Sequence, residues 1–229
     1  MSETLKFYSA GEWTIGSGKP FATINPANGS EVAMIGGASA TDVDNAVKCA
    51  QQAFNNPDWR DLKPHLRARF LYRIGELIDA DVDKLSHIQM TDNGKTISEC
   101  RQMIAGAANC FRYYSGVCET LEGIVTPSRG DYMSVAVSEP IGIVGLITPW
   151  NSPALLEANK IAPALAAGNC VIIKPSEVTP LIALEYARIG EEAGLPPGVL
   201  SVITGASDIG RLIVEHPDIG MISFTGGPA

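Results

Sequence analysis

The chain has 229 residues, enough to bury a substantial hydrophobic core in one domain or two. Its 17 basic and 25 acidic residues give a net charge of −8, and 45% of the residues are hydrophobic. This acidic balance argues against a nucleic-acid groove or an anionic membrane surface as partner, because both require a basic face.

No targeting segment, disulfide framework or metal site is predicted. The first ten residues have neither a basic segment nor an apolar core, so we expect no signal peptide, and no apolar run approaches the roughly 20 residues that span a bilayer. The five cysteines are widely spaced in apolar periodic segments: Cys49, Cys100, Cys110, Cys118 and Cys170. We expect reduced core cysteines of a cytoplasmic protein. Because no Cys or His pair has metal-ligand spacing, we expect no metal.

The first part of the chain changes from short alternating segments to amphipathic helices. Residues 5–35 alternate loosely and are interrupted by turn residues, which predicts short strands or hairpins. Helical periodicity then predicts a helix that opens at Thr41 and a second from Pro64 to Ala80. Asp81 is expected to cap a third helix, which ends near Asn93-Gly94.

A long helix follows, opened by the capping-box pattern from Thr96 to Glu99. Its apolar positions follow the helical period: Ile97, Cys100, Ile104, Ala107, Ala108, Phe111, Tyr114 and Cys118. Each of these helices presents a single apolar face and must pack on another element. We therefore assign residues 1–120 to N-terminal strands and a helical layer that packs on the domain that follows.

Residues 121–140 lose the helical period. Within them, residues 133–138 alternate with period two, which predicts a half-buried strand. We expect this strand to belong to a small sheet separate from the one that follows.

From residue 141 to residue 229, strands and helices alternate. Four apolar runs predict buried strands: Ile143–Thr148, Val171–Lys174, Leu200–Thr204 and Met221–Thr225. Three helical patterns separate them. The first spans about Pro153–Ala167, with Ser152 as N-cap and a kink or end near Pro163. The second has Thr179 as N-cap and Pro180 at its first position, and the third begins at Ser207. This order predicts an α/β fold, a parallel sheet with helices on its faces. Because the chain stops where the next helix would begin, we expect a truncated domain.

Polar residues and glycines follow each predicted strand. Parallel strands end at the same edge of a sheet, so these residues should gather there: Trp150 and Asn151, Lys174 to Glu177, Gly205 to Gly210, and Thr225 to Gly227. Glycine-rich turns that open helices offer N–H groups to a phosphate, a lysine can donate to hydroxyls, and a glutamate can accept from a diol. A nucleotide site is one interpretation, although the GxGxxG fingerprint is missing. The alternatives are a turn or capping role for Asn151, a solvated Lys174–Glu177 pair, and glycines that only permit tight turns.

Longer motifs in the chain resemble a known family. ITPWN at 147–151, ALAAGNCVIIKPSEVTP at 164–180, AGLPPGVLSVITG at 193–205 and FTGG at 224–227 are similar to the aldehyde dehydrogenase superfamily, and DNGK at 92–95 extends the similarity over essentially the whole chain. The resemblance implies a Rossmann-type parallel sheet with flanking helices, truncated before the catalytic domain. It also implies that residues 121–140 belong to a bridging or oligomerisation sheet and residues 141–229 to an incomplete dinucleotide-binding domain.

The resemblance further implies roles for individual residues. Asn151 matches the asparagine whose amide forms half of the oxyanion hole. Lys174 and Glu177 match the pair that binds the adenosine ribose, and a carboxylate at Glu177 would repel a 2′-phosphate, which favours NAD over NADP. The implied cofactor-binding set is Ile147, Thr148, Pro149, Trp150, Lys174, Ser176, Glu177, Gly205, Gly210, Phe224, Thr225, Gly226 and Gly227. The family often has serine at the position of Gly227, so one hydroxyl donor is lost there.

The resemblance also implies an NAD(P)-dependent oxidoreductase that converts an aldehyde to a carboxylate through a cysteine thiohemiacetal. The family's nucleophilic cysteine and general-base glutamate match no residue of this chain, so we expect the 229 residues alone to be inactive. The alternative is an inactive truncated homologue that acts as a weak nucleotide-binding or subunit-docking module. Expected partners are a small-molecule aldehyde and, for a complete protein, further copies in a homodimer or homotetramer.

Overall fold

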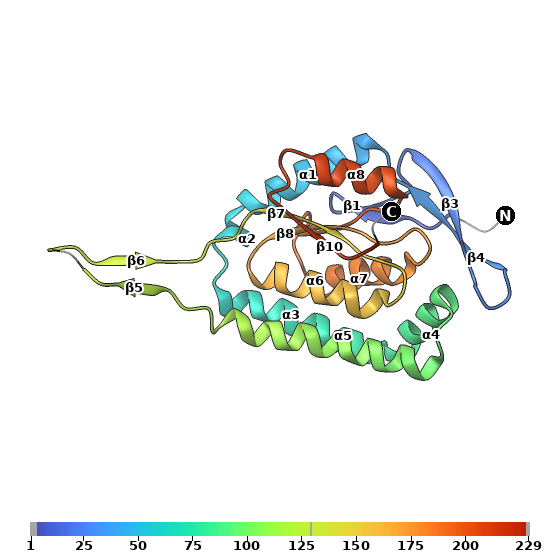
Figure 1. Cartoon of the computed structure of the whole chain (residues 1–229), viewed down its shortest axis with the longest axis horizontal. Coiled ribbons are helices and arrows are strands. Elements are labelled where there is room, and N and C mark those ends of the chain that lie inside the picture. Colours follow the sequence, from blue (N-terminus) through green and yellow to red (C-terminus); the bar gives the residue numbers. More distant parts are fainter. Residues whose placement is uncertain (1–3, 129, 228–229) are drawn as a thin grey trace.

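The computed structural model describes residues 4–128 and 130–227, and its centre is a four-stranded parallel sheet (Figure 1). The strand order is β10-β7-β8-β9. The strands are β7 (Ile143–Ile147), β8 (Cys170–Lys174), β9 (Leu200–Val202) and β10 (Met221–Phe224). Ile147 is paired with both Lys174 and Phe224, so three of the four strands end level with one another. The α/β fold with a parallel sheet is therefore confirmed, and each predicted strand agrees with an observed one to within two residues.

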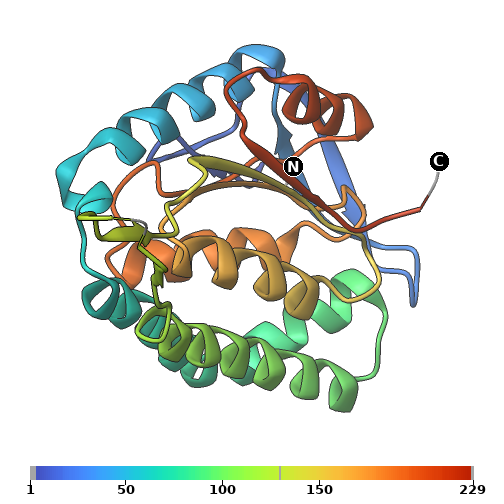
Figure 2. The same ribbon diagram turned by 60° about the vertical axis from the view of Figure 1, so that its left-hand side comes forward.

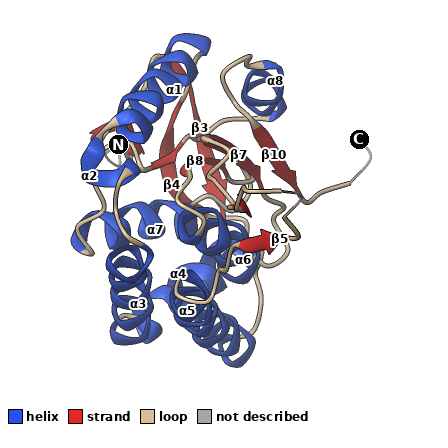
Figure 3. Cartoon of the chain, turned by 90° about the vertical axis from the view of Figure 1, so that its left-hand side faces the viewer, coloured by secondary structure: helices blue, strands red, loops and turns tan. Residues whose placement is uncertain are grey.

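Helices cover both faces of this sheet (Figure 3). On one face lie α6 (Pro153–Ala166) and α7 (Leu181–Glu192), and on the other lie α1 (Ala40–Asn55) and α8 (Ser207–Glu215). A short helix, α2 (Pro57–Arg60), follows α1. With helices on both sides, β8 is buried at every residue, as a continuous apolar run predicts.

Three further helices form an outer layer that packs on α6 and α7 (Figure 2). They are α3 (Pro64–Ala80), α4 (Val82–Asn93) and α5 (Ile97–Cys118). The capping box of Thr96 and Glu99 opens α5, and Gly94 ends α4 in the left-handed conformation at φ 80°. Both were predicted. Arg67 of α3 donates to the Ala166 carbonyl and Trp59 of α2 donates to the Gly168 carbonyl, which fixes the end of α6 against these two helices.

The N-terminal strands form two antiparallel pairs beside the sheet. They are β1 (Phe7–Ser9) with β2 (Glu12–Thr14), and β3 (Gly18–Ile24) with β4 (Glu31–Gly37). Beyond β9, the Thr204 hydroxyl donates to the Gly36 carbonyl at 2.6 Å, and the Ala38 amide donates to the Thr204 carbonyl at 2.9 Å. These bonds fix the β3–β4 pair near the carboxyl end of the parallel sheet.

A hairpin of β5 (Ile124–Thr126) and β6 (Ser134–Ala136) projects away from the rest of the molecule (Figure 1). The prediction of a separate small sheet is confirmed, but the prediction of a half-buried strand is wrong. Val135 and Val125, which pair across the hairpin, are 53% and 66% exposed. Alternation marks the two faces of a strand, and nothing in the described part of the chain covers either face of this hairpin. None of the described helices is long and apolar enough to cross a membrane.

The predicted cap of α7 is wrong, whereas the predicted span of α6 is confirmed. Thr179 does not cap α7, because the helix begins at Leu181 and the Leu181 amide donates to Asp92 Oδ2 at 3.1 Å. The Thr179 hydroxyl instead reaches the Trp150 carbonyl at 3.5 Å. The α6 helix runs from Pro153 to Ala166, within one residue of the predicted span, and of the two alternatives at Pro163 an end of the helix is excluded. Proline removes one donor and its ring crowds the carbonyl four residues earlier, but the packing of α6 between the sheet and α5 sustains the helix past it.

Candidate functional site at the carboxyl edge of the sheet

The turn after β7 lies at the carboxyl edge of the sheet and presents the first predicted site residues. Trp150 is 59% exposed and Asn151 is exposed, while Thr148 is buried just before them. The Thr148 amide donates to the Lys174 carbonyl at 3.3 Å, and the Thr225 amide donates to the Ile147 carbonyl at 3.0 Å. These bonds carry the strand pairing one step past the end of β7. The edge therefore brings the turns after β7, β8 and β10 side by side.

The start of α6 is not capped as predicted. The Ser152 side chain makes no capping bond, and its hydroxyl donates to the Asn151 carbonyl at 2.7 Å. The Ala154 amide, which has no partner within its own helix, donates instead to Gln89 Oε1 of α4 at 3.1 Å. A side chain from another helix thus accepts the hydrogen bond that a capping side chain at the start of α6 would otherwise accept.

Lys174 lies at the end of β8 and is 5% exposed. Its ammonium group donates to the Pro175 and Gly205 carbonyls, each at 2.8 Å, and lies 3.5 Å from Glu177 Oε2. Burial lowers the pKa of Lys174, and the Glu177 carboxylate opposes that effect. The two backbone bonds fix the ammonium between the turns after β8 and β9, with the half-exposed Glu177 carboxylate as its third neighbour.

Glu177 and Gly205 lie on one cavity of about 410 Å³, between the β3–β4 pair and the start of α8. Phe21, Val178 and Ile209 form an apolar wall of this cavity, and the charged groups on it are Lys19, Asp208 and the half-exposed Glu177. A Cβ at Gly205 would lie 2.4 Å from Ile209 Cγ1, which shows how closely the backbone approaches that wall. Such a lining suits a flat aromatic ring with a diol attached.

The other predicted cofactor residues surround these groups. Ser176 is nearly buried, and its Oγ accepts from the Val178 amide at 3.4 Å. A Cβ at Gly210, in the first turn of α8, would lie 3.4 Å from Lys174 Cε, so the lysine side chain packs on this glycine. Pro149 continues the β7 turn between Thr148 and Trp150. These residues shape the edge without adding a charged group.

After β10, the chain turns outward at the far side of this edge. Phe224 is 57% exposed, and a Cβ at Gly226 would lie 2.5 Å from the end of its ring, so a side chain at Gly226 would require this exposed ring to move. Gly227 has open space around it. The structure therefore brings the predicted site residues to one edge of the sheet and leaves the Phe224–Gly227 turn open.

Two ionisable residues of α6 were missed by the sequence reasoning. Lys160 donates to the Ser223 hydroxyl of β10 at 2.8 Å, and burial lowers its pKa. Glu157 is completely buried, and among the described residues neither of its carboxyl oxygens has a hydrogen-bond partner. Burial and the neighbouring Asp92 carboxyl raise the pKa of Glu157 well above its ordinary value. Charged residues within an otherwise apolar predicted helix were the signal in the sequence that could have identified both residues.

The five cysteines do not contribute a nucleophile to this edge. They lie in α1, in α5 and at the start of β8, the opposite end of that strand. Burial raises the pKa of Cys110 to about 11 and that of Cys170 to about 12, which disfavours the thiolate.

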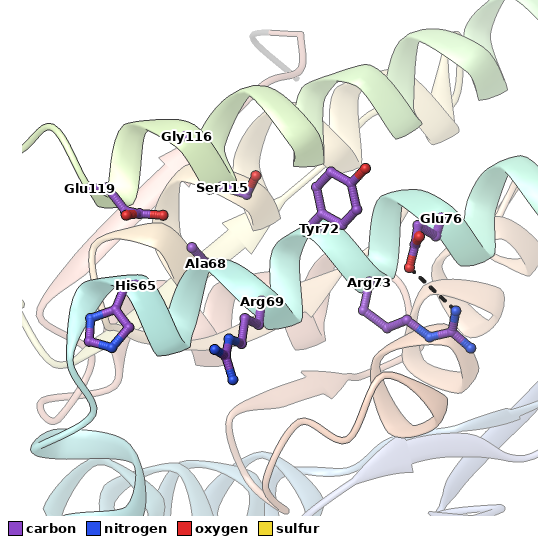
Figure 4. Close-up of a pocket in the computed structure, with 9 residues that line it drawn as sticks. All are labelled: His65, Ala68, Arg69, Tyr72, Arg73, Glu76, Ser115, Gly116 and Glu119. Atoms are coloured by element: carbon purple, nitrogen blue, oxygen red, sulfur yellow. Dashed lines mark hydrogen bonds and ion pairs between the residues drawn. The ribbon is translucent and has the colours of Figure 1, made fainter.

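A separate pocket lies on the surface between α3 and α5 (Figure 4). It is lined by exposed charged groups such as Arg69 and Arg73, of which Arg73 pairs with Glu76 at 3.4 Å. None of the predicted site residues lines it. Exposed ion pairs such as Arg73–Glu76 contribute little to binding or stability. We therefore place the candidate functional site at the sheet edge and not in this pocket.

Comparison with known proteins agrees with this architecture. The model of the Aldehyde dehydrogenase family matches residues 13–229. An aldehyde dehydrogenase of Aspergillus niger is 41% identical over 226 residues, which are 98% of this chain and 45% of that protein. A (Z)-2-((N-methylformamido)methylene)-5-hydroxybutyrolactone dehydrogenase of Acinetobacter baylyi is 39% identical over 228 residues, 99% of this chain and 46% of that protein.

Among solved structures, the NAD+ complex of an aldehyde dehydrogenase from Bacillus cereus superimposes with a TM-score of 0.96 at 35% identity. The superposition covers 98% of this chain and 46% of that one. The chain thus spans slightly less than half the length of the relatives it matches. With the family model matched over nearly all of its residues, the chain belongs to the aldehyde dehydrogenase family.

Proposed function

We propose that this chain provides the cofactor-binding edge and one oxyanion donor of an NAD-dependent aldehyde dehydrogenase, which oxidises an aldehyde to a carboxylate. The observation that carries the proposal is the convergence of Asn151, Lys174 and the cavity with Glu177 and Gly205 at one sheet edge. Two relatives are described as dehydrogenases, and the Bacillus cereus neighbour was solved with NAD+.

The residues present fit a dinucleotide. The cavity beside Gly205 offers an apolar wall for an adenine, and Glu177 at its rim, with Lys174 behind it, offers an acceptor and a donor for ribose hydroxyls. The open space around Gly227 would admit a pyrophosphate, and Ile147 to Trp150 would flank the bound cofactor. The bound cofactor would supply the hydride acceptor. A carboxylate at the ribose position disfavours a 2′-phosphate, so we propose NAD rather than NADP.

Asn151 would act on the aldehyde oxygen. When a nucleophile adds to an aldehyde, negative charge develops on that oxygen, and one preorganised donor there can contribute about 3 kcal/mol. The exposed position of Asn151, in the turn after the buried strand β7, supports this role. The cysteine that adds to the aldehyde, forming a thiohemiacetal, and the glutamate that activates water would both come from sequence outside these 229 residues. By themselves these residues would bind cofactor and not turn over.

The test separates binding from turnover. We expect the 229-residue chain to bind NAD by isothermal titration calorimetry and to produce no aldehyde-dependent NADH absorbance. The product of the complete reading frame should show that absorbance, and should be a cytoplasmic homodimer or homotetramer. Absence of NAD binding by the chain would contradict the proposed site, and turnover by the chain alone would contradict the assignment of the nucleophile.

A second candidate function is an inactive module that binds nucleotide weakly or docks with complete subunits. The comparisons do not favour this candidate, because the relatives at 41% and 39% identity are described as dehydrogenases. A reading frame that stops directly after Ala229, together with NAD binding and no turnover, would support this candidate over the enzyme.

A further inference from the structure

We propose that Gln89 and Asn93 of α4 are positioning residues that hold the turn carrying Asn151 in its donor geometry. This inference rests on the proposed function of Asn151 and extends it to two residues to which the resemblance assigns no task, although Asn93 lies within the DNGK motif. Gln89 and Asn93 lie four residues apart in the last turns of α4, so they share one face of that helix. That face meets the turn from residue 148 to residue 154.

Asn93 holds the turn directly before Asn151. Its Nδ2 donates to the Trp150 carbonyl at 2.6 Å, across 57 residues of sequence. Its Oδ1 is buried and has no hydrogen-bond partner within the described residues, so the Trp150 bond orients the side-chain amide. Because the Trp150 carbonyl belongs to the peptide that joins Trp150 to Asn151, this bond fixes the plane from which the Asn151 side chain departs.

Gln89 holds the turn directly after Asn151. It is fully buried, and its Oε1 accepts from the Ala154 amide at 3.1 Å. The Tyr186 hydroxyl of α7 donates to the carbonyl of the same Ala154 at 2.6 Å. Ser152, the local capping candidate, makes no capping bond. Side chains of other helices therefore fix the start of α6. Between the two held positions, Trp150 and Ala154, lie only Asn151, Ser152 and Pro153.

The end of α4 is itself anchored, so it can transmit a fixed position to the turn. Asp92 accepts from the Thr23 hydroxyl of β3 and from the Leu181 amide of α7, the latter at 3.1 Å. A Cβ at Gly94 would lie 2.6 Å from Pro26 Cγ, which shows how closely the helix end meets the β3–β4 pair. Misplacing a catalytic donor by about 1 Å can cost on the order of 100-fold in rate, so this support matters to catalysis as well as to folding.

The test uses substitutions that remove one atom's function and keep side-chain size. Asn93→Asp replaces the donor to the Trp150 carbonyl with a carboxylate oxygen, and Gln89→Met removes the acceptor for the Ala154 amide. Gln89→Glu keeps an acceptor oxygen and is the rescue variant. Asn55→Asp is the matched control, since Asn55 Nδ2 also donates to a backbone carbonyl, that of Gln51, at 2.9 Å in α1. Gln102→Met, at an exposed position of α5, controls for the other change.

On the 229-residue chain, hydrogen exchange followed by mass spectrometry should show amides 150–156 exchanging about tenfold faster in Asn93→Asp and Gln89→Met. Gln89→Glu and both controls should match the unsubstituted chain. In the product of the complete reading frame, we expect the same two variants to lower kcat at least about tenfold, with the KM for NAD within about twofold. Unchanged exchange, or an equal fall of kcat in the controls, would overturn the positioning role. Failure of the unsubstituted chain to bind NAD would instead overturn the proposed function, because exchange does not depend on cofactor.

Discussion

Asp92 gives the sharpest test of the electrostatics beneath the site. It is 2% exposed, and burial raises its pKa from 3.8 to about 6, although the hydrogen bonds from Thr23 and Leu181 oppose the shift. Below pH 3.8 the carboxyl is protonated in the folded and the unfolded chain alike. Between pH 3.8 and 6 the unfolded chain releases this proton while the folded chain retains it, so folding becomes less favourable as the pH rises.

The size of the effect follows from the difference between the two pKa values. A difference of about 2 units corresponds to about 3 kcal/mol of unfolding free energy over the full pH range. Between about pH 4.5 and pH 7.5, where the chain can be handled, about 2 kcal/mol of this should be lost in the unsubstituted chain. Asp92→Asn removes the titration, so its unfolding free energy should lack this fall.

Urea unfolding monitored by far-UV circular dichroism at about pH 4.5, 6.0 and 7.5 measures the difference. An asparagine at position 92 has one acceptor oxygen for the two hydrogen bonds, so we expect the variant to be less stable at every pH. The informative quantity is therefore how the difference in unfolding free energy between the variant and the unsubstituted chain changes with pH. The Asp92 charge also raises the pKa of Glu157, so Glu157→Gln and the double variant separate the two carboxyls. A constant difference between Asp92→Asn and the unsubstituted chain over this pH range would refute the reasoning.

Two further predictions concern the cofactor and one thiol. Glu177→Gln removes the half-exposed carboxylate that faces the predicted ribose position, so the affinity for NADP relative to NAD should rise several-fold in calorimetric titrations; an unchanged ratio would place the ribose elsewhere. Cys170 is fully buried and its pKa is raised to about 12, so its thiol should react with Ellman's reagent near neutral pH only as the chain unfolds; rapid labelling of Cys170 in the folded chain would contradict its burial.

The sequence by itself determined the elements and the edge at which they meet. The apolar runs that became β7, β8, β9 and β10 are bounded by glycine and proline, and strands covered on both faces are typically continuous apolar runs of this kind. Since parallel strands end at one edge, the order of strands and helices along the chain was sufficient to predict that Asn151, Lys174 and Glu177 gather there. The capping box at Thr96 and the glycine at 94 are local signals, and both appear as predicted.

Only the tertiary structure decided which elements support that edge and which acceptors are the hydrogen-bond partners of its donors. Lys174 donates two of its hydrogen bonds to carbonyls, one of them 31 residues away at Gly205, which no pattern near Lys174 indicates. Gln89 replaces Ser152 as the partner of the first α6 amide, and the β5–β6 hairpin is exposed where alternation predicted burial on one side. Periodicity reports which face of an element avoids water. Which distant side chain meets a given backbone group depends on how the layers pack, and packing is settled only when the whole chain has folded.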